Sequence, residues 1–202
     1  MVEAHLRQES LKPRAVHRRA SALPQIIVDY KYTLWPPTKS DGAVDKIVLD
    51  LGRFAVLDHL LGLLAEYASF DLALEVAPGD ADAEVRAAGR AFGEALAAPL
   101  RADGARGHGS AVLPSAEALA HVALEASDAP LLVSNVDLTR ARLGGMSTDL
   151  VAAFLREFVD GASLTLHVRL IDGTDTHHVL EAIFKALGVT LAQACRPRRR
   201  KE

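Results

Sequence analysis

The sequence contains an internal repeat, and this repeat restricts the possible fold more than any other feature. Residues 55–79 and residues 149–173 show the same order: apolar residues at helical spacing, a strand of alternating apolar residues, and a glycine. A second amphipathic segment follows each glycine, at residues 82–98 and 176–194. Because one such unit leaves an apolar face uncovered, we expect the helices of the two copies to pack against each other.

Two more strands are predicted before the first copy. Residues 25–34 and 44–51 have strand composition, and the Pro36-Pro37 pair between them is a turn signal. Each half is therefore predicted to run strand, strand, helix, strand, helix. The resulting fold class is α+β, a pseudo-duplicated chain in which each half is a small sheet covered by a helix pair.

Basic segments flank the repeat. Residues 1–22 and 196–202 are rich in arginine, and such runs are usually solvated, disordered tails. Contact with an anionic partner is the alternative interpretation. Between the tails, we place the first repeat half at residues 23–103 and the second at residues 104–195.

The overall charge does not favour nucleic acid as a partner. The formal net charge is -3 and the isoelectric point is about 6.2, so the chain has no global basic field. Cys195 is the single cysteine, which excludes an internal disulfide and favours a reducing compartment. No apolar run approaches the roughly 20 residues that a membrane helix needs. We therefore expect a cytoplasmic protein with no membrane partner.

Residues suited to chemistry are concentrated at the start of the last predicted helix. The loop DGTDTHH leads into His177 and His178, and Glu181 follows on the same helix. Glu181 can stand beside either histidine, because positions three or four apart share a helix face. The two histidines diverge by about 100 degrees, which suits two ions or one ion shared between subunits. Imidazole and carboxylate bind manganese, iron, zinc or nickel, whereas a polar helix surface is the simpler alternative.

Neighbouring residues extend this candidate site. Lys185 shares the face of Glu181 and could hold an anionic substrate group. His167, on the preceding predicted strand, adds a third imidazole. A polar residue is expected to cap the helix: Thr174, Asp175 or Thr176.

The other histidines have less specific surroundings. His59 lies on an apolar predicted helix, where a core or interface histidine is more common than a ligand. His108 and Arg106 lie in a glycine-rich stretch that could cradle a phosphate or serve as a flexible connection. His121 is assigned to the surface of a predicted helix at residues 115–125. No serine has the sequence context of a nucleophile.

Several segments together resemble the imidazoleglycerol-phosphate dehydratase family: RRAS at residues 18–21, LDHLL around His59, ASFDLALEV at 68–76, LTLHVRL at 164–170, and GTDTHHVLEAIFKAL at 173–187. The last segment is the most specific. The resemblance implies a ribosomal S5 domain 2-like α+β fold in a trimer-based homo-oligomer, up to a 24-mer. It also implies a manganese-dependent hydro-lyase of histidine biosynthesis that converts imidazole glycerol phosphate into imidazole acetol phosphate.

The resemblance assigns roles to individual residues. Lys185 and Arg106 are implied to bind the phosphate of a small phosphorylated imidazole substrate. Glu181 is the implied catalytic carboxylate. The implied manganese ligands are His59, His167, His177, His178 and Glu181.

The first half departs from the family pattern. The family carries an HHxxED segment there, but the repeat places Ala83, Glu84 and Ala87 opposite the second-half histidines and glutamate. Each family metal takes ligands from both halves, so this loss is expected to weaken both metal sites.

Three functions stay open on these observations. The first is a dehydratase of reduced or altered activity. The second is a catalytically silent paralogue that serves as a structural or regulatory subunit in a mixed oligomer. The third is a binding protein for one metal or a phosphate compound that uses His167, His178 and Glu181.

Overall fold

The first half of the chain forms a three-stranded sheet with two helices. The computed structural model describes residues 25–30, 48–50, 54–75, 79–137 and 142–198. The elements follow the predicted order: β1 Gln25–Tyr30, β2 Val48–Asp50, α1 Ala55–Ala68, β3 Phe70–Glu75 and α2 Ala81–Arg101. The sheet order is β1-β3-β2, with β1 antiparallel and β2 parallel to β3. The predicted tail at residues 1–22 lies outside the described residues.

The second half repeats this arrangement and adds strands to it. Its elements are β4 His108–Ser115, β5 Ala118–Ala126, β6 Leu131–Ser134, β7 Arg142–Leu143, β8 Met146–Ser147, α3 Thr148–Ala162, β9 Leu164–Asp172 and α4 Thr176–Cys195. β5 is antiparallel and β6 parallel to β9, as β1 and β2 are to β3. β4 pairs with β5 and widens the sheet to the order β4-β5-β9-β6. The predicted pseudo-duplicated α+β fold is confirmed.

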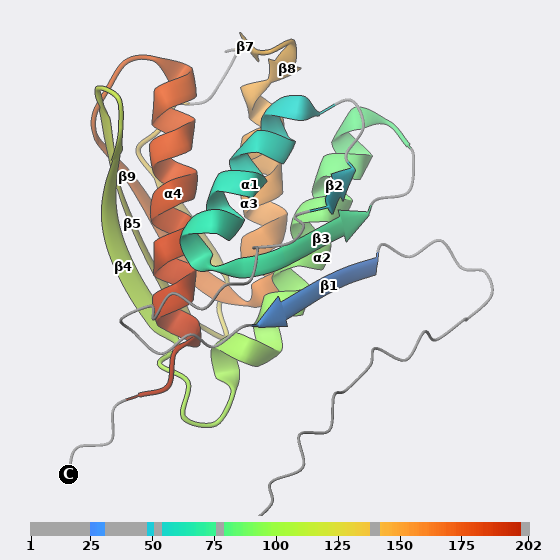
Figure 1. The fold of residues 1–202 in the computed structure, drawn as a ribbon, viewed down its shortest axis with the longest axis vertical. Coiled ribbons are helices and arrows are strands. Elements are labelled where there is room, and N and C mark those ends of the chain that lie inside the picture. Colours follow the sequence, from blue (N-terminus) through green and yellow to red (C-terminus); the bar gives the residue numbers. More distant parts are fainter. Residues whose placement is uncertain (1–24, 31–47, 51–53, 76–78, 138–141, 199–202) are drawn as a thin grey trace, which may run out of the picture.

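Helices from different halves pack in pairs, as the repeat predicts. α2 lies along α3, and α1 lies along α4, beside the four-stranded sheet (Figure 1). Glycines permit both close approaches. A Cβ atom on Gly93 would lie 2.4 Å from the carbonyl oxygen of Phe158, and one on Gly188 would lie 2.4 Å from that of Leu64. The contact between α1 and α4 brings His59 of the first half next to Glu181 of the second.

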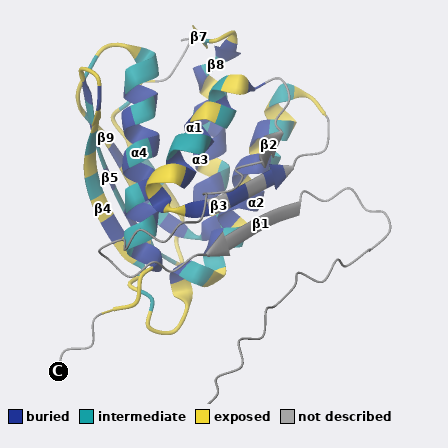
Figure 2. Cartoon of the chain, viewed as in Figure 1, coloured by how far each residue is buried: buried dark blue, intermediate teal, exposed yellow. Residues whose placement is uncertain are grey.

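The core lies where the helices face the sheets and one another (Figure 2). Phe92 of α2 packs against Phe154 and Phe158 of α3, and Phe154 also contacts Phe184 of α4. By length and composition alone α4 could cross a membrane, because an 18-residue stretch of it has a mean hydropathy of 1.2. However, 67% of that stretch is buried inside the protein. α4 is therefore a core helix of this fold.

Residues 115–125 do not form the predicted helix. The chain turns at Ala116, which has a φ of 48°, and continues into β5. There Ala120 and Val122 are buried, while His121 between them lies on the outer face and hydrogen-bonds to Ser110. Alanine and leucine favour helices, but the alternating burial and the pairing of β5 with both β4 and β9 stabilise a strand.

The start of the predicted C-terminal tail contacts the loop before β4. The backbone N–H of Arg106 donates to the carbonyl oxygen of Arg196 at 2.8 Å. The N–H of Arg198 donates to Gly104 at 2.7 Å. Residues 199–202 lie outside the described part of the chain.

Candidate metal centre

The candidate centre is built where α1 of the first half meets α4 of the second. α1 presents His59, and α4 presents His177 and Glu181 four residues apart on one face. Gly188 brings the two helix backbones close, as described above. The packing of the duplicated halves therefore joins residues that are far apart in the sequence.

Asp175 caps α4 and fixes the start of the site. Its side chain accepts hydrogen bonds from the backbone N–H groups of His177, at 2.8 Å, and His178, at 3.2 Å. Of the three cap candidates predicted from the sequence, the structure uses Asp175. An aspartate cap satisfies backbone donors that the first helical turn leaves free, so it also holds the backbone of both histidines.

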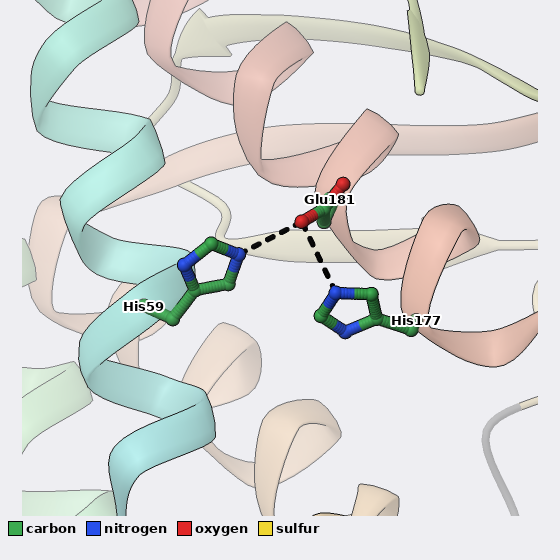
Figure 3. A group of neighbouring side chains, drawn as sticks. All are labelled: His59, His177 and Glu181. Atoms are coloured by element: carbon green, nitrogen blue, oxygen red, sulfur yellow. Dashed lines mark hydrogen bonds and ion pairs between the residues drawn. The ribbon is translucent and has the colours of Figure 1, made fainter. Parts of the chain in front are cut away.

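One carboxylate oxygen of Glu181 faces both imidazoles (Figure 3). Oε1 lies 2.8 Å from Nε2 of His59 and 3.2 Å from Nε2 of His177. The three potential ligand atoms lie within 4.8 Å of one another. The two rings stack, with centroids 5.7 Å apart and an interplanar angle of 13°. All three side chains thus point at a common position.

This donor set fits a divalent transition metal. Two ligands that bind one ion at ~2.1 Å are about 3 Å apart, close to the 2.8 and 3.2 Å that separate Glu181 Oε1 from the two imidazole nitrogens. Two imidazole nitrogens and one carboxylate oxygen suit manganese, iron, zinc or nickel. The side chains of His59 and His177 are 46% and 42% exposed, so further ligands or a substrate can approach.

Electrostatics keep the Glu181 carboxylate ionised. A hydrogen bond from Ser115 is the main cause that lowers the pKa of Glu181 to about 2, and burial opposes it. The hydrogen bond with His59 and the charges of Lys185 and His177 lower the pKa further. An ionised carboxylate is the form that binds a metal ion.

His178 points to a different partner. Its Nδ1 lies 2.5 Å from Oε2 of Glu117, in the turn between β4 and β5. The rings of His177 and His178 are tilted by 56° with centroids 5.9 Å apart. The expected divergence of the adjacent histidines is therefore present. Nothing in the spacing of Glu117 links it to α4, so this contact could not be predicted from the sequence.

His167 and Arg106 lie apart from the cluster in this chain. His167 is exposed on β9 and lines a shallow hollow of about 320 Å³ with Arg106, His108 and Ser110. Arg106 contacts the end of α4 near Arg196, about 27 Å along the helix from His177. Lys185 is close to the centre, since its Nζ lies 3.7 Å from Oε2 of Glu181.

Comparison with known proteins identifies the family. The model of the imidazoleglycerol-phosphate dehydratase family matches residues 53–191. The chain belongs to this family. The imidazoleglycerol-phosphate dehydratase of Syntrophobacter fumaroxidans is 45% identical over 145 residues, 69% of this chain and 73% of that protein. The one from Acetivibrio thermocellus is 40% identical over 144 residues, with the same coverage of 69% and 73%.

Solved structures of imidazoleglycerol-phosphate dehydratases share the fold. The Staphylococcus aureus enzyme matches with a TM-score of 0.65 at 34% identity, covering 70% of this chain and 83% of that one. The Pyrococcus furiosus structure matches with a TM-score of 0.69 at 27% identity, covering 91% and 96%. These matches agree with the resemblance inferred from the sequence.

The helix caps correct the predicted correspondence between the two halves. Asp80 caps α2 as Asp175 caps α4. Counted from these caps, His177 corresponds to Asp82, His178 to Ala83 and Glu181 to Arg86. The correspondence with Ala83, Glu84 and Ala87 was wrong by one position, because Thr174 lengthens the second-half loop.

In the first half, an ion pair occupies the positions that correspond to His177 and Glu181. Arg86 Nε donates to Asp82 at 2.5 Å, and Arg86 also pairs with Glu157 of α3 at 3.5 Å. A guanidinium group takes the place of the Glu181 carboxylate, and it repels a cation. At the corrected positions α2 carries Asp82, Ala83 and Arg86, so the predicted absence of a first-half histidine pair holds.

Proposed function

We propose that the protein binds manganese through His59, His177 and Glu181 and acts as an imidazoleglycerol-phosphate dehydratase in the cytoplasm. The observation that carries this proposal is the convergence of three ligand atoms from two helices on one position. Family membership supports the same reaction class, a hydro-lyase acting on imidazole glycerol phosphate. The cluster lies within the matched residues 53–191.

Each side chain has a part in this proposal. A bound manganese ion supplies a Lewis acid that stabilises negative charge developing on a substrate imidazole. His59 and His177 hold the ion and leave an exposed side for the substrate. Glu181 is the proposed catalytic carboxylate, since its Oε1 contacts both imidazoles. Lys185 and Arg106 are the proposed phosphate contacts, and the position of Arg106 requires it to act in a neighbouring copy.

His178 and His167 are proposed to serve between copies of the chain. When Nδ1 of His178 donates to Glu117, Nε2 keeps its lone pair for an ion. His167 lies on the outer face of the four-stranded sheet. It can therefore bind the ion held by His178 Nε2 only when the two histidines come from different chains. This arrangement favours the trimer-based homo-oligomer implied by the family.

Formation of imidazole acetol phosphate from imidazole glycerol phosphate tests the proposal. Manganese should support turnover in the metal-depleted protein, and Glu181→Gln should abolish it. Rescue of a histidine auxotroph that lacks the dehydratase is the parallel test in cells. No product with manganese, iron, zinc or nickel would contradict the proposed activity.

A second candidate is a catalytically silent subunit of a dehydratase assembly. The Arg86–Asp82 ion pair favours it, because this face of α2 offers no histidine and its one carboxylate in the pair, that of Asp82, is held by a cation. Co-purification with a complete dehydratase would support this role. A protein that pairs with no dehydratase and turns over substrate alone would contradict it.

A further inference from the structure

Ser115 is a buried serine at the end of β4. Its hydroxyl contacts Glu181 through Oε2, the carboxylate oxygen that does not face the imidazoles. Only 6% of the residue is exposed. Its Oγ lies 2.5 Å from Oε2 of Glu181 and 2.8 Å from Nζ of Lys185. Nothing in the sequence pattern marked this serine, since its partners are on α4.

The chemistry of the two partners fixes the direction of both hydrogen bonds. A charged lysine only donates, and an ionised glutamate only accepts. Lys185 therefore donates to the Ser115 oxygen, and the Ser115 hydroxyl donates to Glu181.

The two oxygens of Glu181 consequently have different surroundings. Oε2 is held by Ser115, with Lys185 at 3.7 Å, whereas Oε1 faces His59 and His177. A carboxylate that is free to rotate can offer either oxygen, or both, to an ion. Because Ser115 and Lys185 hold Oε2, only Oε1 is left to bind an ion.

We propose that Ser115 is a positioning residue that holds Glu181 as a one-oxygen metal ligand through Oε1. The inference rests on the proposed metal site and assigns a role to a residue outside the ligand set. Partners that orient metal ligands in this way commonly affect metal affinity by 10- to 100-fold. Ser115 is expected to act through Glu181 alone, without touching the ion.

Manganese titration by calorimetry, with the full chain and three variants, tests the inference. Ser115→Ala should weaken manganese binding about tenfold or more, and Ser115→Thr, which keeps the hydroxyl, should restore most of the affinity. Ser127→Ala is the matched control. It removes a serine hydroxyl that bonds, within the described residues, only to the backbone of Ala129, in the loop after β5. Its affinity should equal that of the wild type.

The visible spectrum of the cobalt(II)-loaded protein separates positioning from a general loss of structure. At saturating cobalt, Ser115→Ala should lose band intensity, because a released carboxylate can bind through both oxygens and raise the coordination number. Wild-type affinity and an unchanged spectrum in Ser115→Ala would overturn the inference and leave the metal site standing. Wild-type protein that binds neither ion would overturn both proposals.

Discussion

Glu181 on α4 lies 2.8 Å from His59 on α1, although 122 positions separate the two residues in the sequence. The contact depends on the duplication, since α1 belongs to the first half and α4 to the second. His177, one turn before Glu181, completes the group at 3.2 Å. The site is therefore a product of the packing between the halves.

Removal of the first-half imidazole should weaken metal binding with little effect on folding. His59→Ala deletes one of three clustered ligands, so manganese affinity should fall by at least about tenfold. The side chain is 46% exposed, so the free energy of unfolding should fall by no more than about 1 kcal/mol, as expected for the loss of one hydrogen bond to Glu181. Calorimetry and urea unfolding measure the two effects. His121→Ala, which removes a histidine on the outer face of β5, should leave manganese affinity unchanged. Equal affinity in His59→Ala would remove His59 from the site.

A methyl group at the close helix contacts should destabilise the fold. Gly93→Ala would place a Cβ 2.4 Å from the carbonyl oxygen of Phe158, so the helices must separate. We expect a loss of about 1–3 kcal/mol in urea unfolding. Gly62→Ala on α1 is the control, because nothing lies within 4 Å of its added Cβ. That variant should gain up to about 1 kcal/mol from helix propensity. A neutral Gly93→Ala would argue against this packing.

Acid should remove the stabilisation that Glu181 provides. Its pKa in the folded protein is lowered from 4.5 to about 2, chiefly by Ser115. A lowered carboxyl pKa stabilises the fold fully above pH 4.5, and the stabilisation is lost as the pH falls toward 2. Glu181→Gln should therefore unfold more easily than the wild type at pH 7, by about 1–3 kcal/mol. The difference should shrink at pH 3. Glu66→Gln, an exposed change on α1, serves as the control, and a pH-independent difference would contradict the assignment.

Cys195 should be unreactive in the folded protein. Burial raises the pKa of its thiol to about 11, and the residue is 8% exposed. The thiolate is the reactive form, so labelling with Ellman's reagent at pH 8 should be slow until urea unfolds the chain. Rapid labelling without denaturant would show that the end of α4 opens readily.

Strong periodicity made most of the fold predictable from the sequence. α1, α3, β9 and α4 follow apolar spacings that suit one type of element each. The repeat predicted the helix-strand-helix order that ends each half, but not the additional strands of the second half. β5 was missed because its alanines and leucines favour a helix, while pairing with β4 and β9 decides the outcome. Such pairing depends on residues far away in the chain.

The site was predictable only along α4. Helical spacing placed Glu181 beside one of the two histidines, and the structure selects His177 because His178 is held by Glu117. The part played by His59 came from the family resemblance. The contact of Ser115 with Glu181 joins β4 to α4, and no local pattern encodes it.

Elemental analysis of the purified wild type and of Glu181→Gln tests whether the cluster of His59, His177 and Glu181 holds an ion. Both proteins are exposed to manganese under the same conditions and then freed of unbound ions. We expect bound manganese in the wild type and the loss of one ion per chain in the variant. A wild-type protein without bound transition metal, or a variant that retains all of it, would rule out metal binding by this cluster.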